Sequence, residues 1–157
     1  MKQFIYTFAM AIIFTACSSN VDANKKMASD FLDLALSDNP LAAQELTHPD
    51  FKFVFMGNTE ISNIPNDRDA YFDYWLPEVV GKLLPNGITL TTTDMIADDD
   101  GVAVIMEGDA EGINGEYDNK YVFVYKFKDG KIFSIHEYNS DLLVATRLYK
   151  NKLVPSD

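Results

Sequence analysis

Apolar residues recur at helical spacing in the segment from Lys25 to Ser37, three or four positions apart. This spacing predicts an amphipathic helix, which the Asp38-Asn39-Pro40 run should end. The LAAQEL segment, 41–46, predicts a second short helix. In the FKFVF segment, 51–55, phenylalanines alternate with other residues, which predicts the first strand. The apolar positions of the first helix are Met27, Ala28, Phe31, Leu32, Leu34 and Ala35.

A third helix is predicted after the loop GNTEISNIPN, because Asn66 or Asp67 can cap a helix that continues to about Leu84. Its apolar residues are spaced at four, and Pro77 should bend or restart it, since proline cannot donate a helical hydrogen bond. The residues with this spacing are Tyr71, Trp75, Val79 and Leu83.

Four strands and a short helix are predicted after residue 87. The strands cover 88–97, 102–112, 116–128 and 131–138, with the DDDG and GING turns among them, and the helix covers 142–150. Helices followed by a meander of antiparallel strands predict an α+β domain, with the helices packed on one face of the sheet.

Composition limits the possible partners. A chain of 157 residues with 47% hydrophobic content suits one domain with a packed core. Thirteen basic and 24 acidic residues give a net charge of −11, which argues against a nucleic-acid partner, because phosphate binding needs clustered positive charge. The two distant histidines and the single cysteine show no metal-site spacing, so no metal or other cofactor is predicted.

The first 17 residues, MKQFIYTFAMAIIFTAC, resemble a bacterial lipoprotein signal. Their apolar run is too short to span a bilayer, and Ala16 precedes the only cysteine, although Phe14 stands where a lipobox prefers leucine. We expect a signal peptide over 1–16, lipidation of Cys17 and a tether over 17–24. This would place the protein in a bacterial cell envelope, at the periplasmic face of the outer membrane. The alternative is an ordinary cleaved signal.

The run YDNKYVFVYKFKDGKIFSIHEYNSD, 117–141, resembles the ending of the SnoaL-like branch of the nuclear transport factor two and ketosteroid isomerase superfamily. The resemblance covers about residues 25–150. It implies a curved antiparallel sheet wrapped around N-terminal helices, a cone-shaped α+β barrel with a deep, mostly apolar pocket, and a homodimer formed through the sheet. His136 replaces the usual arginine of the family, and Ser140 its usual aspartate.

Strand alternation places Tyr117, Asn119, Tyr121 and Phe123 on one face. A two-residue turn after Lys128 would bring His136 to this aromatic face, whereas a three-residue turn with a glycine bulge would bring Glu137 there. We favour the second turn, because it also gathers Phe133 and Ile135 with the aromatic residues. Lys126, Ser134 and His136 would then share the other face.

The predicted site follows from these faces and from the resemblance. By analogy with the family, Glu107 and Asp109 should face the pocket, so Glu137 and Glu107 become candidate catalytic carboxylates. Burial and a like neighbour would raise the pKa of such a glutamate. The structural alternative is that these carboxylates are solvated or hydrogen-bonded. The candidate ligand-binding residues are Tyr121, Asn119, Tyr117, Trp75, Asp109, Phe123, Phe31 and Phe55.

Two known chemistries of the superfamily fit poorly. The three places used by ketosteroid isomerase fall at Phe55, Phe31 and Phe123, which cannot transfer protons. The Asp-Arg-Asp relay of the epoxide hydrolases lacks its arginine. We therefore favour binding of a small, largely apolar molecule. The alternatives are a cofactor-independent isomerase, cyclase or hydrolase with Glu137 as acid or base, and a non-catalytic dimerisation or interaction module.

Overall fold

The computed structural model describes residues 20–155, so the predicted signal peptide and Cys17 lie outside the described residues. Within 20–155, no helix is both long enough and apolar enough to cross a membrane. The helical segments are residues 20–35, α2 (Leu41–Gln44), α3 (Arg68–Ala70), η1 (Tyr71–Val80), α4 (Gly81–Leu83), α5 (Asp141–Leu143) and η2 (Val144–Leu148). The strands are β1 (Thr47–Met56), β2 (Pro65–Asp67), β3 (Ile88–Asp98), β4 (Gly101–Gly112), β5 (Gly115–Glu116), β6 (Lys120–Lys128) and β7 (Lys131–Tyr138).

One curled sheet organises the domain, with strand order β2-β1-β7-β6-β4-β3 and β5 paired to β4. All neighbours are antiparallel except β1 and β7, which run parallel, with Phe53 opposite Ile135. The predicted α+β cone is confirmed, although the sheet is mixed rather than wholly antiparallel. The parallel pair forms because β1, which comes early in the chain, lies beside the last strand.

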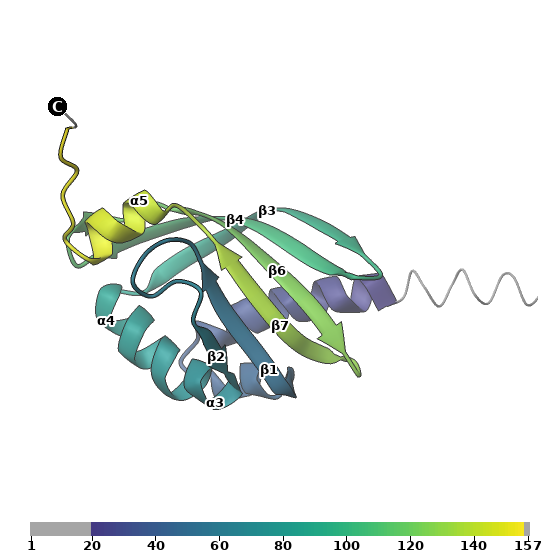
Figure 1. The fold of residues 1–157 in the computed structure, drawn as a ribbon. Coiled ribbons are helices and arrows are strands. Elements are labelled where there is room, and N and C mark those ends of the chain that lie inside the picture. Colours follow the sequence, from purple (N-terminus) through teal and green to yellow (C-terminus); the bar gives the residue numbers. More distant parts are fainter. Residues whose placement is uncertain (1–19, 156–157) are drawn as a thin grey trace, which may run out of the picture.

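The core lies between the sheet and the helices that cover its inner face (Figure 1). Phe31 of the N-terminal helix is fully buried against Tyr71 and Phe72 of η1 and against Tyr125 of β6. Its position explains the spacing of apolar residues in both helices, since each turns one stripe toward the sheet. Burial of this aromatic cluster is a large part of what holds the helices in place.

Several boundaries differ from those predicted. Residues 20–24, assigned to the tether, are helical and continuous with the first helix. The short β2 lies where a loop and a helix cap were predicted; it pairs with β1 at the sheet edge, where proline is tolerated. Residues 117–119 interrupt the strand predicted over 116–128, yet the alternation of buried residues continues through them.

Asp67 caps the third helix as predicted, its Oδ1 accepting a hydrogen bond from the Ala70 amide at 3.0 Å. Pro77 lies inside η1, and the helix widens to π-type turns, as in the bond from the Gly81 amide to the Leu76 carbonyl. The wide turns accommodate a proline that cannot donate a backbone hydrogen bond. The helical course therefore continues past Pro77 to Leu83.

The β6–β7 hairpin places Glu137 on the inner face, but by a different route from the predicted one. The turn has two residues, Asp129 and Gly130, with φ angles of 52° and 71°, and the expected three-residue turn is wrong. Beyond the turn the register shifts by one residue at Phe133, a β-bulge. Glu137 then pairs with Phe123.

The bulge also separates Phe133 from the core residues with which it was grouped. Its ring packs edge-on against His48 and lies beneath the Lys128 ammonium, outside the core cluster. His136 pairs with Val124, and Ser134 with Lys126, so the expected separation of His136 from Glu137 is confirmed.

The predicted inner face of β4 is wrong. Residues directly opposite one another in paired strands point to the same side, and Tyr121 and Phe123 pair with Met106 and Val104. Met106 and Val104 are therefore buried, while Glu107 pairs with Lys120 on the outer face. The analogy with the family had placed the alternate set of β4 residues in the pocket.

Gly101 provides a test of the tight packing between β4 and β6. A Cβ atom at this position would lie 2.2 Å from the backbone oxygen of Tyr125. We expect Gly101→Ala to lower the free energy of unfolding by about 1–3 kcal/mol in chemical denaturation. The control is Gly81→Ala, whose Cβ would come no closer than 3.5 Å to any of its neighbours; it should be neutral or slightly stabilising. Equal stability of the two variants would contradict this packing.

Candidate functional site

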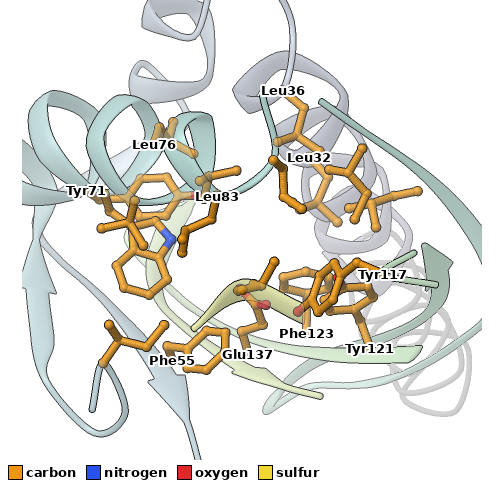
Figure 2. A pocket seen from close by; sticks show the side chains of 18 residues that line it. Leu32, Leu36, Phe55, Tyr71, Leu76, Leu83, Tyr117, Tyr121, Phe123 and Glu137 are labelled. Atoms are coloured by element: carbon orange, nitrogen blue, oxygen red, sulfur yellow. The ribbon is translucent and has the colours of Figure 1, made fainter. Parts of the chain in front are cut away.

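A cavity of about 80 Å³ lies between the helices and the inner face of the sheet (Figure 2). Its walls are almost wholly apolar, and of the described residues that line it only Glu137 belongs to the acidic or basic types. The lining residues are Leu32, Leu36, Phe55, Ile61, Tyr71, Trp75, Leu76, Val79, Val80, Leu83, Leu84, Ile88, Leu90, Tyr117, Tyr121, Phe123, Glu137 and Leu148. The fold thus surrounds one carboxyl group with hydrocarbon.

The aromatic residues proposed for the pocket divide into two groups. Phe55, Trp75 and Phe123 line the cavity, with the Phe55 and Trp75 rings 5.6 Å apart. Phe31 does not line it, because it packs deeper, against Phe51 of β1. The aromatic side chains therefore narrow the pocket without filling it completely.

Glu137 is partly buried on β7, and Figure 2 shows it beside Phe123 and below the helices. Burial raises the pKa of its carboxyl to about 7, because the apolar walls disfavour the charged form. A hydrogen bond from Asn139 Nδ2 to Glu137 Oε1, 3.0 Å long, opposes this shift. The carboxyl is therefore mostly protonated below pH 7 and can donate a hydrogen bond into the cavity.

Two tyrosines line the same end of the cavity as Glu137 (Figure 2). Burial raises the pKa of Tyr117 to about 12, and burial together with the neighbouring Tyr117 and Glu137 raises the pKa of Tyr121 still further. Both phenols remain protonated at physiological pH. Their hydroxyl groups can donate hydrogen bonds as well as accept them.

Asn119 supports this arrangement from behind the cavity wall. It is buried, and its Oδ1 accepts hydrogen bonds from the Lys120 amide at 2.9 Å and the Ser140 amide at 3.1 Å. Its Nδ2 can then only donate, and it does so to the Tyr117 hydroxyl at 3.0 Å. Since Asn119 does not line the cavity, it positions Tyr117 rather than meeting a ligand.

The two carboxylates proposed on β4 lie outside the cavity. The Glu107 side chain is 57% exposed and forms an ion pair with Lys120 at 2.9 Å. Asp109 is also exposed, and it lines a separate hollow, which leucine side chains of the helical segments divide from the cavity. The expected convergence of Glu107 and Glu137 is therefore absent, because their side chains leave the sheet on opposite faces.

The site includes residues that sequence reasoning did not propose for it. Tyr71 of η1 lines the cavity close enough for Glu137 to contribute to the raised pKa of its phenol, after burial itself. Asn139 binds the carboxyl directly. Tyr71 stood in the predicted helical stripe, four residues before Trp75, so its inward direction was available as a signal. Asn139 gave no such signal, because it follows the strand.

The chemistry available here is that of neutral hydrogen-bond donors in an apolar space. The Tyr117 and Tyr121 hydroxyls are hydrogen-bonded to each other, so this pair has one proton left to donate. That proton and the Glu137 carboxyl can each be donated to a carbonyl or hydroxyl oxygen, and above pH 7 the ionised Glu137 could accept a proton. Within residues 20–155, no group of three or more histidine, cysteine, aspartate or glutamate side chains is arranged to hold a metal ion.

A family model, that of the SnoaL-like domain, matches residues 28–135, more than half of the chain. The chain belongs to the SnoaL-like domain family. This agrees with the curled sheet and the helix-covered cavity of the structure. No curated protein matches the chain by sequence.

Solved structures share the SnoaL-like fold at low identity. Bal32a, from a soil-derived mobile gene cassette, is 19% identical with a TM-score of 0.70, over 82% of this chain and 96% of Bal32a. A protein from a Jannaschia species, provisionally named a SnoaL-like polyketide cyclase, is 14% identical with a TM-score of 0.68, over 84% and 95%. A nuclear transport factor two-like protein from Anabaena variabilis is 17% identical with a TM-score of 0.64, over 76% and 91%. At these identities the likeness shows the fold alone.

The raised pKa of Glu137 predicts a particular pH dependence of stability. In the unfolded chain this carboxyl loses its proton near its ordinary pKa of 4.5, but in the folded protein it does so near 7. The folded state holds more protons between these values, so the contribution of Glu137 to stability falls as pH rises from about 4.5 to about 7. We expect the free energy of unfolding of Glu137→Gln, relative to that of the native protein, to be up to about 3 kcal/mol higher at pH 8 than at pH 4.

Urea denaturation of both proteins across this pH range measures the difference. The control is Glu107→Gln, the same substitution at an exposed carboxylate, which should leave the pH dependence of the native protein unchanged. A stability difference between Glu137→Gln and the native protein that does not vary with pH would mean that Glu137 titrates normally.

Proposed function

We propose that this SnoaL-like domain binds a small, largely apolar molecule that carries a hydrogen-bond acceptor, and holds the acceptor against Glu137. The observation that carries the proposal is a protonatable carboxyl beside two phenols in an otherwise apolar cavity. A buried donor without a partner costs about 1–3 kcal/mol, so a ligand oxygen that accepts from these groups would be favoured over a purely hydrocarbon ligand.

The proposal extends to where the protein acts. The signal-like segment and Cys17 support a domain tethered by lipid to the periplasmic face of the outer membrane. The tether would leave residues 20–155 free to receive a ligand beside the membrane. Dimerisation through the outer face of the sheet is a further part of this proposal, supported by the family resemblance.

The tether is tested by fractionating cells that express the full chain or the Cys17→Ala variant. We expect the full chain in the membrane fraction and the variant released from it, because acylation of Cys17 supplies the anchor. The control is Ser18→Ala, which keeps the cysteine and should stay in the membrane fraction. Membrane association that survives the loss of Cys17 would exclude the lipid anchor.

A second candidate function is catalysis by Glu137 as a general acid or base. A pKa of about 7 suits proton transfer near neutral pH, and Tyr117 and Tyr121 could orient a substrate oxygen. With Glu107 outside the cavity, any such reaction must proceed with one carboxyl group. Isomerisation or cyclisation meets this requirement more easily than the two-carboxylate hydrolysis of epoxides. The provisional name of the Jannaschia protein is consistent with this class.

Binding is tested with acetone, the smallest ketone, by following backbone amide resonances in NMR titrations. We expect shifts at cavity residues and binding that weakens as pH rises through 7, because ionised Glu137 can no longer donate to the carbonyl. Glu137→Gln should lose this pH dependence, since its amide donates at every pH. Glu107→Gln is the matched control and should behave as the native protein does.

Absence of shifts at cavity residues would contradict the binding function. Binding that does not vary with pH would remove Glu137 from the site while leaving the cavity as a binding place. To detect a natural ligand, native mass spectrometry of the protein purified from its own envelope would look for a retained small molecule. If the native protein converts the retained molecule and the Glu137→Gln variant does not, the enzymatic function is favoured.

A further inference from the structure

A second hollow, of about 710 Å³, adjoins the cavity. It lies between the end of the N-terminal helix, η1 and the paired ends of β3 and β4. Five residues line both spaces, and we call them the partition: Leu36, Leu76, Val80, Leu84 and Ile88. The two spaces are therefore separated by single aliphatic side chains.

The partition consists of side chains from separate elements. Figure 2 shows Leu36, in the turn that follows the N-terminal helix, near Leu32 of that helix, with Leu76 and Leu83 on the facing helical segment. Leu36 is 41% exposed, so it has room to change rotamer. Exposed side chains change rotamer within nanoseconds, and a chain-like molecule could thus pass between the leucines without any movement of the backbone.

Size requires that most of a ligand lie outside the inner cavity. Binding pockets for small molecules usually measure about 300–1,000 Å³, and a cavity of about 150 Å³ admits one benzene ring. At about 80 Å³ the inner cavity holds only the end of a larger molecule. The outer hollow, at about 710 Å³, has the volume for the remainder.

The outer hollow has a different chemistry from the inner cavity. Its floor is apolar, but its rim carries the carboxylates of Asp109 and Glu111 and the polar side chains of Asn86 and Thr89. Among the described residues that line it, none is lysine, arginine or histidine. An anionic group placed there would meet like charge, whereas a cationic or neutral polar group would not.

We propose that the ligand is an elongated amphiphile, with its largely apolar end, which carries the hydrogen-bond acceptor, in the inner cavity and a cationic or neutral polar head in the outer hollow. The inference rests on the proposed function, because it needs the inner cavity to bind. It adds two properties of the ligand, its length and the charge of its head group. Molecules with an anionic head group are excluded. The two spaces act as one site with the partition between them.

The test compares three probes with the same ten-carbon chain: decyltrimethylammonium, decyl maltoside and decyl sulfate, each used below its micelle concentration. Isothermal titration should show the cationic and neutral probes binding at least about tenfold more tightly than the sulfate. The Asp109→Asn/Glu111→Gln double variant should reduce the difference in affinity between the cationic probe and decyl sulfate to about twofold. The Asp33→Asn/Glu45→Gln variant removes two exposed carboxylates elsewhere and should keep the native preference, which controls for net charge.

A blocking variant separates the two spaces. Thr89 is exposed and, of the two spaces, lines only the outer hollow. A tryptophan there would fill part of the hollow, so Thr89→Trp should lower the affinity for the cationic and neutral decyl probes about tenfold. Acetone, the smallest ketone, should bind this variant as it binds the native protein, since Thr89 does not line the inner cavity. Its unchanged binding also shows that the variant is folded.

The outcomes distinguish the two proposals. If acetone binds but the decyl probes bind without regard to head charge, or the sulfate binds most tightly, the inference is wrong and the proposed function stands. If the charge preference survives the Asp109→Asn/Glu111→Gln change, the outer hollow is not where the head lies, and the inference is again wrong. If neither acetone nor any decyl probe binds, both proposals fail.

Discussion

The site depends on one backbone feature, the β-bulge at Phe133. Without the extra residue, the two-residue turn at Asp129-Gly130 would continue in register and bring His136 to the inner face. With it, Glu137 faces Phe123 across the strand pair and enters the cavity. Bulges commonly redirect side chains near functional sites, and here the bulge exchanges an imidazole for a carboxyl. The carboxyl then lies among the apolar side chains that line the cavity.

Once placed there, Glu137 sets the chemistry of the cavity. Its burial would be unfavourable if it stayed charged, so the folded protein favours the neutral acid and raises the pKa to about 7. Tyr117, held by Asn119, stands at the same end as a second donor. The result is a small set of neutral donors facing hydrocarbon, which suits a ligand oxygen on an apolar molecule. The acidic surroundings of the outer hollow then decide what the other end of that molecule can be.

The sequence predicts most of the fold, because apolar residues recur regularly in the helices and strands that bury only one face. Alternating residues from Tyr117 to Tyr125 and the helical stripe at Tyr71 and Trp75 both correspond to buried faces. Prediction from the sequence fails where a shift of one residue changes the face of the sheet that a side chain occupies. The two cases are the bulge at Phe133 and the inner face of β4, on which Glu107 was wrongly expected. Local pattern does not determine register, because register depends on pairing between strands distant in the chain.

The most direct test is to titrate Glu137 itself. Carbon-13 NMR of protein labelled at glutamate side-chain carboxyl carbons would follow its resonance, assigned as the signal that disappears in Glu137→Gln. The structure predicts a midpoint near pH 7. A midpoint near the ordinary value of 4.5 would show that the carboxyl is solvated and that Glu137 does not lie in an apolar cavity.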